Sequence, residues 1–465
     1  MHMLRDATLV AVLAAVHACS AAGDAPPVAD APDTPAVPFE RFVLPNGLTL
    51  IVHEDDDAAA VHVRVFYHVA ERDAGPGQRG HAHLFEHLAF SRTEGLDRSV
   101  WDFLAAVGAR EYDANSRFDY TQYFATAGVE ALDTLLWLEA QRMARLAPAL
   151  TDDDLRRSQG EVRREAEQLA QVPVLRILKA TLEHTYPAGH PYAAFDVAPP
   201  DVDAATLRDA LRFYERHYHP GNAVLVVAGS VDAEAVRAGV EARFGAIAGG
   251  PQRTRAEPRI ARGEGTRRAR IEGVLRGPHL RVVWNTPGWG TADADHVALA
   301  MPSIAARVRE RLMADGLAAQ VDGGSEMREL GGQATLDISA PASADVAGIE
   351  SVVHEEIARF IAEGPTAAEL EQAKAAHRGR IDQALADLAG RAELLGVAEL
   401  LGGDAGQIDT MLRRIANATA EGGASREKLL EGGVPGISDL HLHDSSVLIN
   451  KRKVGDREDP VHPCG

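Results

Sequence analysis

The stretch His83-Leu84-Phe85-Glu86-His87 decides how this sequence is interpreted. Two histidines four positions apart lie on one face of a helix, so His83 and His87 are spaced to bind a single metal ion. Zinc accepts neutral imidazole nitrogens, and a catalytic zinc needs three protein ligands and a water molecule. Glu86 is placed to lie beside that site, where its carboxylate can take a proton from the metal-bound water. The alternative is a helix that carries two solvent-facing histidines and a glutamate by chance.

A later helix offers the carboxylate that would complete such a site. Thr151 is a favourable N-cap, and the three aspartates after it stabilise a first turn, so a helix is predicted from there to about Gln171. It offers Glu161, Glu165 and Glu167, and the first two share a face because they are four residues apart. Either could reach the metal while the other supports a ligand. Otherwise these glutamates form a solvated helix face.

The order of the motif, H-x-x-E-H, is a signature of zinc peptidases, and the composition agrees with nitrogen and oxygen ligands. The two cysteines, Cys19 and Cys464, lie near opposite ends and form neither a CxxC metal site nor a disulfide framework. The chain has 465 residues, 46% hydrophobic and 25% charged, which is enough for two or more globular domains. Its net charge of −20 argues against nucleic acid as a partner. The same charge could attract basic peptides, or simply maintain solubility.

The N-terminus has the features of an export signal. Arg5 precedes an apolar run over residues 7–16 that is too short to span a bilayer, so residues 1–19 are predicted to be a signal peptide. Cys19 ends a sequence that resembles a bacterial lipoprotein cleavage box, and cleavage without lipidation is the alternative. Residues 20–38 are rich in Ala, Pro and Asp and are predicted to be a disordered tether. We expect an exported protein of the periplasm or cell envelope, with membrane attachment only through a lipid on Cys19.

The remaining chain divides into two α+β units. An N-terminal catalytic domain is expected over residues 39–246, a linker over 247–269, a second domain over 270–455 and a tail over 456–465. Residues 61–69 alternate apolar and polar side chains, which predicts a half-buried strand. One long helix is expected from Thr366 to about Leu401. The two halves share a rough order of elements, which suggests a weak internal duplication, but the chain after Gly422 lacks the closing strands that a second copy needs.

With these residues in view, the chain resembles the pitrilysin or insulinase family of inverted zinc peptidases, which includes the mitochondrial processing peptidases. The resemblance runs from about Phe42 to about Leu401. It rests on segments similar to the family's opening hairpin, motif helix, substrate-edge strand and last strand of the first domain. These are Leu44–Leu48 with Ile51 and Val52, Gly80–Phe90, Asp119–Phe124 and Asn222–Gly229.

The resemblance implies a fold, a reaction and a ligand set. The fold would be two ferredoxin-like domains of the processing-peptidase type, each a mostly antiparallel sheet packed with helices, the second of them inactive. The chain would be a zinc metalloendopeptidase, with one Zn²⁺ per chain held by His83, His87 and Glu165, which follows His87 by 78 positions. Glu86 would be the catalytic base. A peptide substrate would add to an exposed sheet edge beside the metal.

Two further expectations come from positions around that site. Family members often carry a carboxylate seven residues before the third ligand, where this chain has Ser158, so Glu161 is expected to support a ligand instead. Along the substrate edge the resemblance indicates Ala114, Asn115 and Tyr123. An aspartate precedes Ala114 where relatives usually have asparagine, which leaves the substrate contacts at that point open.

The second half departs from family members that work alone. Those members carry an Arg and a Tyr that hold the substrate, and residues 312–319 have Leu312 and Ala319 at the matching positions, with Arg311 one residue away. The departure predicts the catalytic subunit of a heterodimer with a homologous subunit, or else a homodimer. The alternative is a non-catalytic assembly or binding subunit of a peptidase complex, although the retained Glu86 is the base that catalysis requires.

Overall fold

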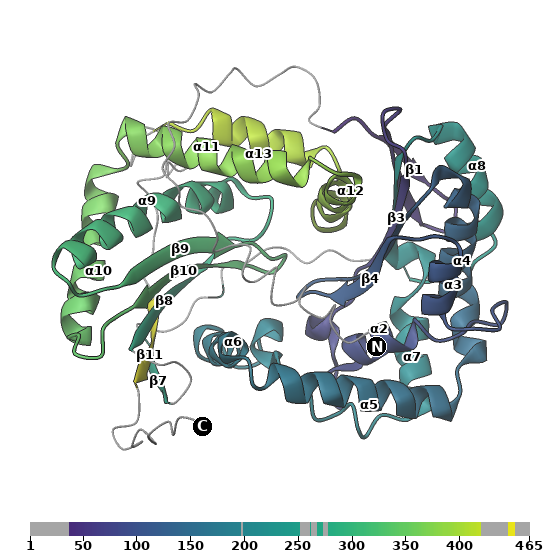
Figure 1. The fold of residues 1–465 in the computed structure, drawn as a ribbon, viewed down its shortest axis with the longest axis horizontal. Coiled ribbons are helices and arrows are strands. Elements are labelled where there is room, and N and C mark those ends of the chain that lie inside the picture. The colour runs from purple at the N-terminus through teal and green to yellow at the C-terminus, as the bar shows by residue number, and fades with distance from the viewer. Residues whose placement is uncertain are drawn as a thin grey trace, which may run out of the picture.

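The structure, a computed structural model, describes residues 37–196, 199–251, 261, 267–272, 278–419 and 445–451. The predicted signal peptide, Cys19, nearly all of the tether and the final tail lie outside the described residues. Two sheets, each with its own helices, make up the described chain (Figure 1). We call them the N-terminal and C-terminal domains.

The N-terminal domain is built on a six-stranded sheet in the order β1-β2-β6-β3-β5-β4. Every neighbouring pair is antiparallel except β2–β6. Helices α2, α4, α7 and α8 pack on one face over a continuous apolar core. The strands are β1 (Glu40–Val43), β2 (Thr49–Glu54), β3 (Val61–Tyr67), β4 (Glu111–Ser116), β5 (Thr121–Ala127) and β6 (Ala223–Gly229). The helices are α2 (His81–Leu88), α3 (Val100–Ala106), α4 (Leu132–Ala149), α5 (Asp152–Leu169), α6 (Pro173–Thr185), α7 (Leu207–His217) and α8 (Ala233–Phe244), with 3-10 turns η1 (Glu71–Asp73), η2 (Val129–Ala131), η3 (Pro191–Ala194) and η4 (Pro220–Asn222).

The C-terminal domain repeats this topology in a five-stranded sheet of order β7-β11-β8-β10-β9. Its last strand, β11, is parallel to β7 and antiparallel to β8, just as β6 lies between β2 and β3. The strands are β7 (Arg267–Glu272), β8 (His279–Thr286), β9 (Gln320–Glu326), β10 (Gly332–Ser339) and β11 (Ser445–Lys451). The helices are α9 (Ala292–Ala314), α10 (Val346–Glu363), α11 (Ala367–Ala384), α12 (Leu388–Val397) and α13 (Gln407–Ala416), and a π-helical turn, η5 (Ala398–Gly402), follows α12. The fold class and the duplicated order of elements agree with the sequence prediction.

Each domain lends one helix to the other. Helix α12 packs on the face of the N-terminal sheet that its own helices leave open, and α6 packs against strands of the C-terminal sheet (Figure 1). Leu395 of α12 joins Ile51, Phe66 and Val226 in one buried cluster. Gly396 permits this approach, because a Cβ there would come within 2.0 Å of the Phe66 ring. The two domains therefore share an apolar core at α12.

Several sequence expectations are wrong, for identifiable reasons. Strand β3 is buried along its whole length because α12 covers its second face, so it is not half-buried. The helix expected from Thr366 to Leu401 is broken, because Asp387 caps a new helix through the backbone N–H of Gly390. Strand β7 begins inside the predicted linker, and β11 supplies a closing strand where the sequence analysis expected none.

The substrate-edge assignment also needs correction. Residues 119–124 overlap β5, which lies between β3 and β4, so β4 is the strand at the edge. Among the described helices, none is both long and apolar enough to cross a bilayer.

Candidate active site

Helix α2 carries the motif on one face and core residues on the other. Leu84, Phe85 and Leu88 are buried, whereas His83, Glu86 and His87 are partly exposed. The helix begins after Gly80, which has a left-handed φ of 82°. A Cβ on Gly80 would lie 2.6 Å from side-chain atoms of Pro199 and Val202, so only glycine fits this conformation and this approach. Residues outside the five-residue motif thus determine where α2 starts.

Three side chains converge beside α2. The Nε2 atoms of His83 and His87 are 3.2 Å apart. An oxygen of Glu165 lies 3.3 Å from the first and 3.2 Å from the second. Ligands of a tetrahedral zinc at about 2.0–2.1 Å would be about 3.3 Å from one another, so this set of atoms fits zinc. Within the described residues, no other group of histidine, cysteine and acidic side chains is arranged to hold a metal.

Glu165 reaches this position because α5 packs against α2. Thr151 caps α5 as predicted, accepting a hydrogen bond from the N–H of Asp154. Val162 and Ala166 are buried toward the domain, which turns the neighbouring Glu165 toward α2. The third glutamate on this helix, Glu167, is exposed.

The charges around the histidines favour a divalent cation. An oxygen of Glu161 lies 3.4 Å from Nδ1 of His87, on the side of the ring away from Glu165. Burial lowers the pKa of His87, but hydrogen bonds with Glu161 and Glu165 outweigh it and raise the pKa to about 10. Burial raises the pKa of Glu165, but its hydrogen bonds with His83 and His87 bring that pKa well below its usual value. The hydrogen bond with His87 also lowers the pKa of Glu161, so Glu161 and Glu165 are both ionised at neutral pH. The buried Ser158 lies one turn before Glu161 on the same helix.

The site opens into a cavity of about 2180 Å³ between the two domains. His83, Glu86 and His87 line it from α2, and Ala114 and Asn115 line it from the edge strand β4. The C-terminal domain contributes lining residues from α9, β9, β10 and α11. The expectation that Tyr123 lies along the substrate edge is wrong. Tyr123 is on β5, one strand in from the edge, and its side chain is fully buried. The candidate base and the candidate metal ligands therefore face a space large enough for an extended peptide.

The segment that lacks the family's Arg and Tyr lies at the end of α9. Leu312 is completely buried in the core of the C-terminal domain, and Ala319 is exposed just before β9. Arg311 turns to α10, where it pairs with Glu355 at 2.6 Å and Glu356 at 3.0 Å. Arg311 is therefore engaged in a local ion pair and is not a shifted substitute for the missing arginine.

One buried pair beside the motif was missed in the sequence. The Arg142 guanidinium donates to both oxygens of Glu139 at 2.7 Å and to the carbonyl of Ala89, the residue that ends α2. The Cζ atom of Arg142 lies 4.4 Å from the centroid of the Tyr123 ring and 5.4 Å from the centroid of the Phe90 ring. Two opposite charges three residues apart in an apolar helix were the available signal. The pair holds the C-terminal end of α2, as Gly80 defines the other end.

Comparison with known proteins agrees with this geometry. Residues 50–193 match the family described as Insulinase (Peptidase family M16), and residues 204–376 match the Peptidase M16 inactive domain. The zinc protease PqqE of Helicobacter pylori is 29% identical over 199 residues, which cover 42% of this chain and 44% of that protein. An uncharacterized zinc protease of Streptomyces coelicolor is 26% identical over 82% of this chain and 84% of its own length, and one of Mycobacterium leprae is 29% identical over 82% and 86%.

Solved structures show the same fold. A protease from Helicobacter pylori superposes with a TM-score of 0.74 at 19% identity, covering 89% of this chain and all of that one. Pitrilysin superposes with a TM-score of 0.71 at 15% identity, covering 90% of this chain but 45% of pitrilysin, so the present chain spans about half its length. The relatives named zinc proteases support a zinc-dependent peptidase. Taken with the repeated α+β fold and the converging His83, His87 and Glu165, these matches show that the chain belongs to the pitrilysin/insulinase family of zinc peptidases.

Proposed function

We propose that this protein is a zinc-dependent endopeptidase that cleaves peptides or unfolded segments. The observation that carries the proposal is the convergence of His83, His87 and Glu165, with Glu86 on the same face of α2, in the wall of the inter-domain cavity. Bound zinc would supply a Lewis acid and bring the pKa of water to about 7. His83, His87 and Glu165 would hold it. Glu86 accepts the proton of the attacking water and returns it to the leaving amine nitrogen.

Neighbouring residues would orient the ligands and the substrate. We propose that Glu161 accepts a hydrogen bond from Nδ1–H of His87, which fixes the ring so that Nε2 faces the metal. The outer edge of β4 ends the sheet, so the backbone near Ala114 and Asn115 can pair with an extended peptide. Backbone inside a folded sheet or helix is already paired, which favours flexible substrates.

We further propose that the chain works with a homologous subunit. Leu312 and Ala319 replace the Arg and Tyr of self-sufficient family members, so a related partner would supply that pair; a homodimer would leave it missing. One solved relative, PqqL of Escherichia coli, is described as periplasmic, which supports the proposal that this chain is exported. Mass spectrometry of the mature N-terminus would show whether Cys19 carries a lipid.

The test compares wild type with Glu86→Gln, which removes the base but keeps the shape. Each protein is assayed for zinc content and for cleavage of an internally quenched, unstructured peptide, alone and with a homologous subunit that has the Arg and Tyr. Both should bind one zinc, and the variant should lose about 10²–10⁴-fold in cleavage rate. Glu167→Gln, an exposed change on α5, is the control and should cleave like wild type.

The competing function is a non-catalytic assembly or binding subunit, which the missing Arg and Tyr favour. It predicts that wild type and Glu86→Gln behave alike in every assay. If both bind zinc but neither cleaves, even with the partner present, the endopeptidase proposal is refuted and the binding role remains.

A further inference from the structure

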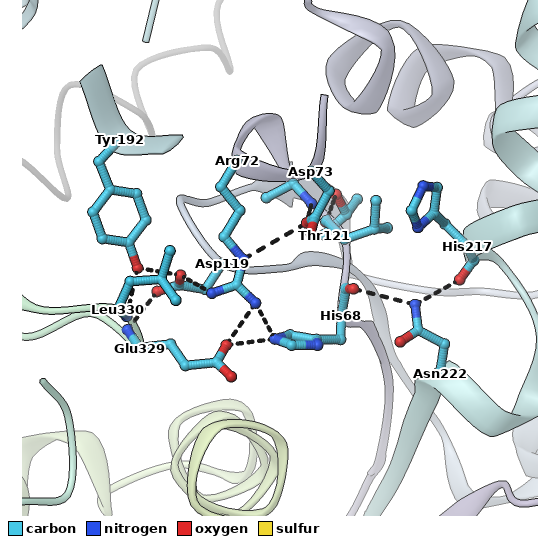
Figure 2. Close-up of polar contacts among 12 residues, drawn as sticks. His68, Arg72, Asp73, Asp119, Thr121, Tyr192, His217, Asn222, Glu329 and Leu330 are labelled. Carbon is cyan, nitrogen blue, oxygen red and sulfur yellow. Dashed lines mark hydrogen bonds and ion pairs between the residues drawn. The ribbon is translucent and has the colours of Figure 1, made fainter. Parts of the chain in front are cut away.

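We infer that Glu329, in the C-terminal domain, is a positioning residue. Through a buried ionic contact it holds α2 of the N-terminal domain, the helix that carries the proposed zinc ligands His83 and His87. Glu329 lies in the hairpin tip, by which we mean residues 327–331 between β9 and β10. This tip inserts into the N-terminal domain, where Glu329 and Leu330 lie beside Arg72 and Asp119 (Figure 2). The catalytic part of the inference rests on the proposed zinc site, whereas the structural part can be tested without it.

The backbone of the hairpin tip is fixed first. The N–H of Glu329 donates to one oxygen of Asp119 at 2.9 Å, and the N–H of Leu330 donates to the Tyr192 hydroxyl at 3.0 Å. That hydroxyl in turn donates to the other oxygen of Asp119 at 2.5 Å. Asp119 and Tyr192 belong to the N-terminal domain, and both are buried. The tip therefore has a single register within its receiving site.

The side chain of Glu329 completes a buried ion cluster. One of its oxygens lies 2.7 Å from the Arg72 guanidinium and also contacts the His68 ring (Figure 2). The same guanidinium donates to Asp119 at 2.7 Å. Burial lowers the pKa of Arg72, but Asp119 and Glu329 outweigh it and hold that pKa above its usual value, so the cation persists. Glu329 is 2% exposed, and without its charge Arg72 would keep one buried carboxylate partner in place of two.

Arg72 connects this cluster to α2. It lies in the turn η1, next to Glu71, whose carboxylate accepts a hydrogen bond at 2.8 Å from the N–H of Gly80. Gly80 has no side chain with which to cap α2, so Glu71 fixes the start of the helix. Helix α2 has eight residues, and so short a helix depends on its surroundings for stability. The contacts run from Glu329 through Arg72 and η1 to the helix that carries His83.

The ionic contact of Glu329 is not needed to keep the domains together. Helix α12 already joins them through apolar packing, and α6 contacts strands of the C-terminal sheet. A second buried carboxylate, Glu399, makes a two-point ion pair with Arg41 at 2.9 Å. Arg41 is on β1, at the opposite end of the sheet from β4. A buried ion pair contributes little net stability but can define one arrangement. Glu329 and Glu399 are thus two buried carboxylates that each pair with an arginine of the N-terminal domain. Only the contact of Glu329 leads to α2, so Glu399 serves as the control.

The experiment uses the full-length zinc-loaded chain and compares Glu329→Gln with Glu399→Gln. Hydrogen exchange followed by mass spectrometry reports on residues 70–88, and a chelator competition reports the rate of zinc loss. Glu329→Gln should raise exchange in that segment about tenfold and speed zinc loss by a similar factor, since outer supporting contacts commonly matter about 10–100-fold. The kcat of Glu329→Gln should fall, whereas its KM should stay within about threefold of the wild-type value, because α2 positions the base and not the peptide. Glu399→Gln should leave segment 70–88 at the wild-type rate.

Equal exchange of residues 70–88 in the two variants would overturn the inference, whatever their melting temperatures. If Glu329→Gln does not fold, Tyr192→Phe removes only the hydroxyl that joins Leu330 to Asp119, and it should raise exchange in the same segment by a smaller factor; an unchanged segment would again overturn the inference. Faster exchange of residues 70–88 in Glu329→Gln alone, in a protein that never cleaves peptide, would support the positioning role of Glu329 and refute the peptidase proposal. The failures of the two proposals are therefore distinguishable.

Discussion

Leu395→Ala should destabilise the N-terminal domain, although Leu395 belongs to a helix encoded after the C-terminal sheet has begun. Leu395 is 1% exposed and packs against Ile51, Phe66 and Val226 of the N-terminal sheet. The change removes three carbons, which at about 0.8 kcal/mol per buried methylene costs about 2.4 kcal/mol. The cavity left behind brings the total to about 3–5 kcal/mol, because helix and sheet are held apart by the surrounding side chains.

The assay is calorimetry combined with hydrogen exchange of β3 and β6. A loss of 3 kcal/mol in a domain of about 200 residues lowers Tm by about 6–12 °C. Leu370→Ala is the matched control, because Leu370 is 5% exposed in the core of the C-terminal domain. Leu395→Ala should reduce protection in β3 and β6, and Leu370→Ala in β8 and β10. If Leu395→Ala lowers protection only in the C-terminal sheet, the reasoning about the shared core is wrong.

Three other changes test the surroundings of the site and of the C-terminal domain. Gly80→Ala forces a side chain into a left-handed backbone 2.6 Å from neighbouring atoms, so it should cost about 1–3 kcal/mol in urea unfolding and speed zinc loss to a chelator. Arg142→Met leaves the buried Glu139 carboxylate unpaired and should cost about 3–5 kcal/mol, part of which the double variant with Glu139→Gln recovers in the same unfolding assay. The pKa of Glu369 is lowered from 4.5 to about 2, mainly by the hydrogen bond from Arg307. The ionised Glu369 therefore contributes to the stability of the folded state above pH 4.5, and this contribution is lost as the pH falls toward 2. The urea midpoints of wild type and Glu369→Gln should therefore differ at pH 7 and converge in acid; a constant difference would contradict this assignment.

The sequence predicted those parts of the site that depend on local spacing. His83 and His87 share a face because they are four residues apart, and the capped helix that presents Glu165 follows from Thr151 and the aspartates after it. The structure brings these side chains together, and their binding of zinc remains a prediction. The choice of Glu165 over Glu161 needed the family resemblance, because both share one helical face and only the packing of α5 on α2 distinguishes them.

The errors concern contacts between distant segments. The alternation in Val61–Tyr67 indicates a strand, but it does not reveal that α12 covers the second face and that Glu393 pairs with Arg64 there. A similar limit explains why β5 was mistaken for the edge strand, since alternation does not identify a strand's neighbours. The hairpin tip carries two charged side chains, those of Arg328 and Glu329. It is buried because Asp119, Arg72 and Tyr192 of the other domain provide its partners.

The exchange of helices between the domains has a consequence for biosynthesis. The N-terminal sheet is complete once β6 has been made, but α12, which covers its second face, begins about 160 residues later. At about 5–20 residues per second, the ribosome needs roughly 8–30 s to make that stretch. During this interval an apolar sheet face that includes Ile51, Phe66 and Val226 has no cover from α12 and is available for non-native association. The N-terminal domain is therefore the first to be synthesised and among the last to be completed.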